Sequence, residues 1–134
     1  MSHIFIAEDN YSDAVLLREA LRENGVEAEY ELAEDGEKAI QKLRRLENGG
    51  PLPDLIVLDL NLPRVRGQDI LRFIRAEDGL KHINTVIVTS SGAKRDRDAC
   101  TAADAYFIKC SDWDDCLKLA QHLAAFLPAE PSSH

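Results

Sequence analysis

The stretch that decides the fold is Leu55-Ile56-Val57-Leu58-Asp59, an apolar run that breaks off at a carboxylate. Four consecutive apolar side chains bounded by turn residues are typical of a strand buried on both faces of a parallel sheet. Three other segments have the same design: residues 4–7 before Glu8 and Asp9, residues 86–88 before Thr89, and residues 106–108 before Lys109.

Amphipathic segments separate these runs. Asn10 is a favourable cap for a helix that carries Ala14, Leu17 and Leu21 on one face. Residues 27–32 alternate weakly between polar and apolar side chains, which predicts a partly exposed strand at a sheet edge. Further helical spacing follows Gly36 and the loop that ends at Gly67.

The last two helices differ in their signals. Residues 93–103 carry almost no large apolar side chain, so we expect a helix there to be short, frayed or mobile. Ser111 and Asp114 resemble a capping box that opens the final helix.

This alternation predicts an α/β fold, (βα)5, doubly wound and flavodoxin-like. The order 2-1-3-4-5 suits its parallel five-stranded sheet, because it places the weakest strand at an edge and the two strands that end in acids side by side. We expect one domain over residues 1–128 and a flexible C-terminal tail over residues 129–134.

Composition excludes several function classes. Hydrophobic residues make up 45% and charged residues 30% of the 134 residues, as in a globular protein. The net charge of −8 argues against nucleic-acid binding, since phosphate backbones require a basic surface. No apolar run is long enough for a membrane span and no signal segment opens the chain, so the expected location is cytoplasmic and the expected partners include no membrane.

The cysteines point to no metal site. Cys100, Cys110 and Cys116 are odd in number and lack C-x-x-C spacing, and the histidines are scattered. We therefore expect reduced thiols in a reducing compartment and no zinc.

The polar residues that end the strands should meet, because the carboxyl ends of parallel strands share one edge of the sheet. Glu8, Asp9 and Asp59 would repel one another there unless a cation sat among them, and oxygen ligands of this kind suit Mg²⁺. Each residue also has a simpler interpretation. The acids after the first strand can cap a helix, Thr89 can be ordinary strand sequence, and Lys109 can reach into solvent.

Five blocks of sequence resemble the receiver domain of two-component response regulators, the CheY-like family. They are residues 6–10 (IAEDN), 33–39 (AEDGEKA), 54–63 (DLIVLDLNLP) with Gly67, 88–91 (VTSS) and 106–109 (YFIK). The resemblance covers residues 3–127, and the third and fourth blocks are most similar to stand-alone regulators paired with phytochrome-like histidine kinases.

The resemblance implies a function and a site. Asp59 would accept a phosphoryl group from a histidine kinase, and the protein would signal through a downstream protein or phosphotransfer partner, as a monomer or homodimer and not as an enzyme. The implied Mg²⁺ ligands are Glu8, Asp9, Asp59 and the backbone carbonyl of Asn61. Thr89 and Lys109 would contact the phosphoryl group, and Tyr106 would turn inward as an aromatic switch.

Two departures and two alternatives stay open. Cys110 stands where the family usually has a proline after the lysine, which leaves the Lys109–Cys110 peptide either trans or strained. Residues 93–103 carry few large apolar side chains, so it stays open whether this chain has the fourth helix and the output surface that the family usually forms there. The alternatives are a non-phosphorylated pseudo-receiver adaptor and a small Mg²⁺-dependent aspartyl-phosphate phosphohydrolase. A flavin-binding protein is excluded, because the turn after the first strand lacks a phosphate cradle rich in hydroxyl side chains and glycine.

Overall fold

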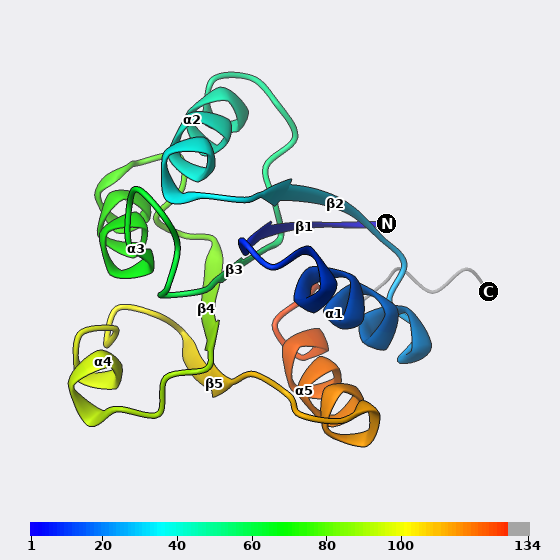
Figure 1. Cartoon of the computed structure of the whole chain (residues 1–134). Coiled ribbons are helices and arrows are strands. Elements are labelled where there is room, and N and C mark those ends of the chain that lie inside the picture. The colour runs from blue at the N-terminus through cyan, green and yellow to red at the C-terminus, as the bar shows by residue number, and fades with distance from the viewer. Residues whose placement is uncertain (129–134) are drawn as a thin grey trace.

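The computed structural model describes residues 1–128, and these form one parallel sheet flanked by helices (Figure 1). The strands are β1 (Ser2–Ala7), β2 (Ala28–Ala33), β3 (Leu55–Leu58), β4 (Asn84–Thr89) and β5 (Ala105–Ile108). The helices are α1 (Tyr11–Glu23), α2 (Gly36–Glu47), α3 (Gly67–Ala76), α4 (Lys94–Asp98) and α5 (Trp113–Ala124). The strand order is β2-β1-β3-β4-β5, as predicted. The expected C-terminal tail lies outside the described residues.

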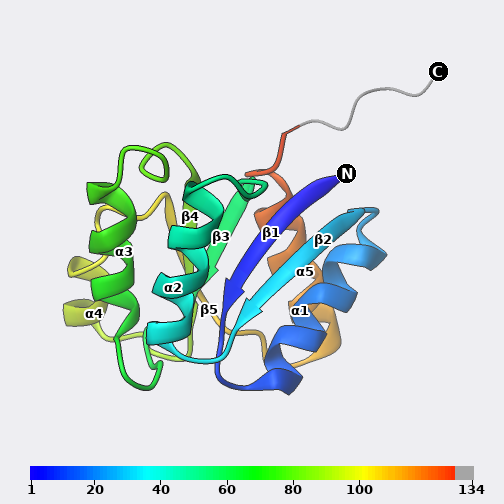
Figure 2. The same cartoon turned by 90° about the horizontal axis from the view of Figure 1, so that it is seen from above.

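The sheet separates two hydrophobic clusters. Helices α2, α3 and α4 cover one face, and α1 and α5 cover the other (Figure 2). Strand β3 contributes to both clusters, because Ile56 and Leu58 lie in the first and Leu55 and Val57 in the second. All four side chains are buried, which accounts for the unbroken apolar run that suggested the fold.

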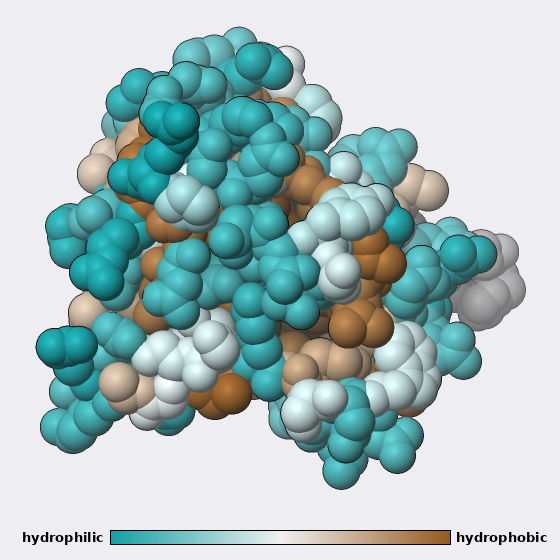
Figure 3. Space-filling model, viewed as in Figure 1, coloured by the Kyte–Doolittle hydropathy of each residue, from teal (hydrophilic) through white to brown (hydrophobic). Residues whose placement is uncertain are grey.

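Strand register brings distant residues to one edge. Ala7 pairs with Leu58 and Thr89 pairs with Ile108. Just beyond these pairs, the amide of Asp59 donates to the carbonyl of Ala7 at 3.0 Å, and the amide of Lys109 donates to the carbonyl of Thr89 at 2.9 Å. Figures 1 and 3 look onto this edge, and Figure 3 shows hydrophilic residues over most of it, with smaller apolar patches between them.

Helix α5 begins differently from the prediction. Its N-cap is Asp112, whose side chain accepts the backbone amide of Asp115 at 2.8 Å. Ser111 instead contacts the carboxylate of Asp115, so the capping box predicted from Ser111 and Asp114 is wrong. Trp113 opens the helix with 42% of its surface exposed.

Helix α4 is short, as predicted from its lack of apolar residues. It spans five residues, none of them buried, and the residue before it provides no side-chain cap. Within residues 1–128 no helix combines the length and the apolar character that crossing a bilayer requires.

Candidate functional site

Three carboxylates meet where β1 and β3 end. Glu8, Asp9 and Asp59 each place an oxygen within 4.8 Å of the others. Asp59 is buried, the Glu8 side chain is largely buried and Asp9 is exposed, so the group opens to solvent on one side. Oxygen donors gathered this closely repel one another when ionised, and they match the ligand preference of a hard divalent cation.

Asn61 lies beside the same carboxylate. Its backbone amide donates to Oδ1 of Asp59 at 3.1 Å, which turns the loop after β3 back over the strand end. Gly67 makes this loop possible, because a Cβ at its position would collide with the backbone of Asp59 and Leu60. The close backbone approach of α3 therefore holds the backbone of the loop that begins at Asp59.

Lys109 is the centre of an ion-pair cluster. Its ammonium lies 2.8 Å from Oε1 of Glu8, 2.8 Å from Oδ2 of Asp59 and 2.8 Å from Oδ2 of Asp13. One cation faces more than one anion here, so the cluster retains negative charge that a second cation can neutralise.

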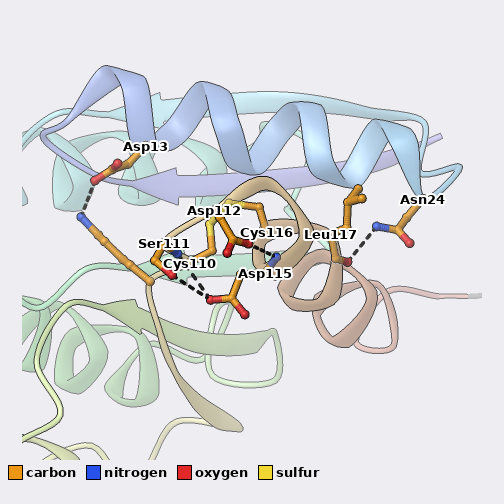
Figure 4. Close-up of a disulfide and its surroundings, with 9 residues drawn as sticks. Asp13, Asn24, Cys110, Ser111, Asp112, Asp115, Cys116 and Leu117 are labelled. Atoms are coloured by element: carbon orange, nitrogen blue, oxygen red, sulfur yellow. Dashed lines mark hydrogen bonds and ion pairs between the residues drawn. A yellow bond between two sulfur atoms is a disulfide. The ribbon is translucent and has the colours of Figure 1, made fainter.

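Asp13 is a site residue that sequence reasoning missed. It lies in the first turn of α1, where its amide is bound by the capping side chain of Asn10 at 3.2 Å. The cap orients this turn over the strand ends and so brings the Asp13 carboxylate to Lys109 (Figure 4). The sequence did contain a signal for this residue. Asp13 stands three residues after the cap Asn10, which itself directly follows two acids.

Thr89 and Tyr106 belong to β4 and β5, which lie on the opposite side of β3 from β1. Thr89 is fully buried at the end of β4, where its hydroxyl accepts the amide of Ser91 at 3.5 Å and helps to lower the pKa of Asp59. The Tyr106 hydroxyl donates to the carbonyl of Ser91 at 2.6 Å, and the guanidinium of Arg97 lies 5.0 Å from the centre of its ring. Tyr106 is therefore hydrogen-bonded to the loop that follows β4, and its ring also contacts Arg97 of α4.

The two partly buried acids titrate in opposite directions. Burial raises the pKa of Glu8 to about 7, against the effect of its hydrogen bond from Lys109, and the charge of Asp59 raises it further. Burial also acts to raise the pKa of Asp59, but hydrogen bonds from Lys109 and from the Asn61 amide prevail and hold it below its ordinary value. Asp59 is consequently ionised at neutral pH, whereas Glu8 is protonated in a large fraction of molecules.

Burial acts to lower the pKa of Lys109, but its hydrogen bonds to Asp13, Asp59 and Glu8 outweigh this and raise it above the ordinary lysine value. The ammonium is therefore permanently charged under physiological conditions.

Cys110 and Cys116 form a disulfide (Figure 4). This overturns the expectation of reduced thiols for these two residues, and only Cys100, which is buried, is a free cysteine among the three. The bond joins the loop after β5 to α5, six residues apart in sequence. No peptide bond in residues 1–128 is cis, so the Lys109–Cys110 peptide is trans.

The fold and this cluster define a doubly wound α/β protein whose strand ends carry acids, a hydroxyl and a lysine around one central aspartate. The response regulator receiver domain model matches residues 4–121. The chain belongs to this family, as the sequence blocks predicted.

Relatives of known identity support the assignment. The chain is 32% identical to the response regulator Rcp1 of Synechocystis over 92% of its own length and 86% of that protein. It is 31% identical to a probable methanogenesis regulatory protein, FilR2, of Methanothrix harundinacea, over 92% of its length and 81% of that protein.

Solved structures give the same result. The Mn²⁺-bound form of Rcp1 matches with a TM-score of 0.83 and 31% identity, covering 96% of this chain and all of that one. The phosphorylated cyanobacterial phytochrome response regulator RcpA matches with a TM-score of 0.85 and 30% identity, covering 98% of this chain and 99% of that one.

Proposed function

We propose that the chain is a phosphoryl acceptor that relays a signal and is not an enzyme with turnover, with Asp59 accepting its phosphoryl group from a phosphohistidine of a histidine kinase. The observation that carries this proposal is the ionised, buried carboxylate of Asp59, paired with Lys109 at 2.8 Å and flanked by Glu8 and Asp9. A carboxylate oxygen of Asp59 would form a bond to phosphorus while the bond from phosphorus to the histidine nitrogen breaks. The product is an acyl phosphate on Asp59 and a neutral histidine on the kinase.

The surrounding side chains suit this reaction. Lys109 already contacts Asp59 and can neutralise charge on the phosphoryl oxygens as they approach, and the Thr89 hydroxyl can donate to the transferred group. We assign Mg²⁺ to the acidic cluster, with Asp9, Asp59 and the Asn61 carbonyl as ligands and Glu8 as a direct or water-mediated one. When bound, Mg²⁺ would neutralise charge on the equatorial oxygens of the phosphoryl group.

Tyr106 would carry the signal outward. Once Thr89 turns toward the phosphoryl group, the space it vacates can admit the Tyr106 ring, which requires the hydroxyl to leave the Ser91 carbonyl. Because Arg97 of α4 packs on the same ring, this movement would also shift α4.

We further propose a phytochrome-like histidine kinase as the donor, since a similar structure is that of a phytochrome response regulator. Output would pass to a downstream protein or phosphotransfer partner. Histidine kinases consume ATP, so the proposed compartment is the cytoplasm.

The test is phosphorylation by acetyl phosphate with and without Mg²⁺, followed by intact mass. We expect one added phosphoryl group that requires Mg²⁺ and disappears in Asp59→Asn. Asp78→Asn is the matched control, because Asp78 is a fully exposed acid in an exposed pair with Lys81 and should leave the modification unchanged.

Other outcomes decide between the remaining classes. Retention of the added mass in Asp59→Asn would contradict the proposal. Absence of modification in the parent protein would favour a pseudo-receiver adaptor, and rapid release of phosphate with multiple turnovers would favour a phosphohydrolase.

A further inference from the structure

The disulfide adjoins the proposed site through the backbone. Cys110 directly follows Lys109, whose own amide donates to the carbonyl of Thr89 at 2.9 Å. The peptide that carries the Lys109 side chain is therefore held by β4 on one side and, through Cys110 and Cys116, by α5 on the other. Cys110 also lines the pocket that contains Glu8, Asp59 and the Lys109 side chain.

The bond is not needed to start α5. Asp112 caps the helix through the amide of Asp115, and the amide and hydroxyl of Ser111 donate to the Asp115 carboxylate. These contacts do not involve either sulfur atom. Loss of the bond would leave the first turn of α5 capped and would free mainly Cys110, which links Lys109 to Ser111, and so remove one restraint on the position of Lys109.

The two sulfur atoms differ in accessibility. Cys116 is buried in the cluster between the sheet and α1 and α5, whereas Cys110 is half-buried and is followed by exposed residues. A small thiolate can therefore approach Cys110 more readily than Cys116.

From these observations we propose that Cys110 and Cys116 are a reversible oxidation site, whose disulfide holds Lys109 against Asp59 and thereby sets the rate at which the chain accepts a phosphoryl group. This inference rests on the proposed function of Asp59. In a compartment that keeps most thiols reduced, disulfides are usually transient or regulatory, which agrees with a site that switches.

The chemistry balances as two exchanges. For reduction, a thiolate of the glutathione type attacks Sγ of Cys110, a mixed disulfide forms there and Cys116 leaves as a thiolate that takes up a proton. A second small thiolate attacks the sulfur of the attached small molecule, and Cys110 leaves as a thiolate and takes up a proton. Two small thiols become one small disulfide, and the protein gains two electrons and two protons. Oxidation is the reverse, with a small disulfide as the oxidant.

Release of Cys110 should weaken the placement of the ammonium. Lys109 contacts three carboxylates from three element ends, after β1, in the first turn of α1 and after β3, so a displacement of its backbone disturbs this set of contacts. Since transfer depends on precise placement of charge around Asp59, we expect the reduced protein to accept phosphoryl groups about threefold to tenfold more slowly.

The experiment compares the full chain in oxidised and reduced glutathione buffers. Alkylation and intact mass should find one reactive thiol in the oxidised protein after unfolding and three in the reduced protein. The rate of modification by acetyl phosphate with Mg²⁺ should fall on reduction. The Cys116→Ser variant should be phosphorylated slowly in both buffers. The Cys100→Ser variant keeps the disulfide, so its phosphorylation rate should fall on reduction as that of the parent protein does.

A second measurement separates this inference from the proposed function. Hydrogen exchange at the Lys109 and Cys110 amides should accelerate on reduction, whether or not Asp59 becomes phosphorylated. If neither the oxidised nor the reduced protein is phosphorylated, the proposed function fails. The exchange rates alone then show whether reduction of the disulfide changes the segment that carries Lys109.

Three results would overturn the inference. They are three reactive thiols in every glutathione buffer, exchange at Lys109 that does not change with the redox state, and a redox effect on phosphorylation that persists in Cys116→Ser.

Discussion

At the scale of single residues, Asp13 differs from the other acids of the site because it lies on a helix and does not follow a strand. The Lys109 ammonium is shared equally among Glu8, Asp13 and Asp59, each at 2.8 Å. Asp13 comes from α1 and belongs to neither strand end, so it can hold Lys109 without contributing to the acidic cluster of Glu8, Asp9 and Asp59. In the proposed phosphorylation, Asp13 would therefore compete with the incoming phosphoryl group for the Lys109 ammonium.

We predict that Asp13→Asn accelerates phosphorylation by acetyl phosphate by roughly threefold to tenfold, which corresponds to about 0.7 to 1.4 kcal/mol in the barrier. The substitution removes one anion near the incoming phosphate and one competitor for the Lys109 ammonium, which Glu8 and Asp59 still hold in place. The rate of mass gain at fixed Mg²⁺ measures this. Asp69→Asn, an exposed acid paired with Arg72 on α3, controls for the change in net charge. A slower Asp13→Asn would instead mean that Asp13 positions Lys109.

At the scale of secondary-structure elements, the close approach of α3 to the β3 loop leaves no room for a side chain at Gly67. Gly67 is the first residue of α3, and a Cβ there would lie 2.8 Å from Cα of Leu60 and still closer to the carbonyl oxygen of Asp59. Both of these atoms are backbone, so relief requires the loop itself to move.

Gly67→Ala should lower the free energy of unfolding by about 1 to 3 kcal/mol, the usual cost of overpacking. Urea unfolding monitored by circular dichroism measures the change. Gly92→Ala is the matched control, because a Cβ there would meet only the end of the Ile108 side chain at 3.9 Å. Equal midpoints for the two variants would show that the β3 loop can move without cost.

Elements were predictable where burial dictates the sequence. Strand β3 is buried on both faces, so its apolar run has one simple explanation, whereas the start of α5 does not. Ser111 and Asp112 are both good caps, and only the path of the loop decides that Asp112 accepts the amide of Asp115. The same loop path brings Cys110 to Cys116, which spacing in sequence does not reveal.

The same reasoning explains which site residues were found. Glu8, Asp9, Asp59, Thr89 and Lys109 lie at or directly after strand ends, where the parallel order of the sheet alone brings them to one edge. Asp13 was missed because its position depends on the rotation of α1 about its axis, which the Asn10 cap sets.

At the scale of the whole molecule, the acidic edge makes stability depend on pH. The pKa of Glu8 is raised by burial from its ordinary 4.5 to about 7 in the folded protein. Between these values the folded state binds more protons at Glu8 than the unfolded state, so stability should fall as pH rises through this range. Asp59, whose pKa is lowered, is ionised throughout the range and contributes no slope there.

In the absence of metal, urea unfolding at about pH 5 and about pH 7.5 should therefore find the parent protein less stable at the higher pH. Glu8→Gln should lose this part of the dependence, so the difference in stability between the two proteins should change with pH. A constant difference across the range would show that Glu8 titrates normally. Titrations of both proteins at matched ionic strength make the comparison quantitative.

Trp113, the only tryptophan in the chain, opens α5 between the two bonded cysteines. Its indole is partly exposed, and disulfides quench indole fluorescence on contact or at short range. The chain therefore carries one intrinsic fluorophore three residues from each bonded cysteine in sequence. Emission can be followed in real time in unlabelled protein, and a time course recorded in this way would resolve opening of the bond from later rearrangements of the sheet edge.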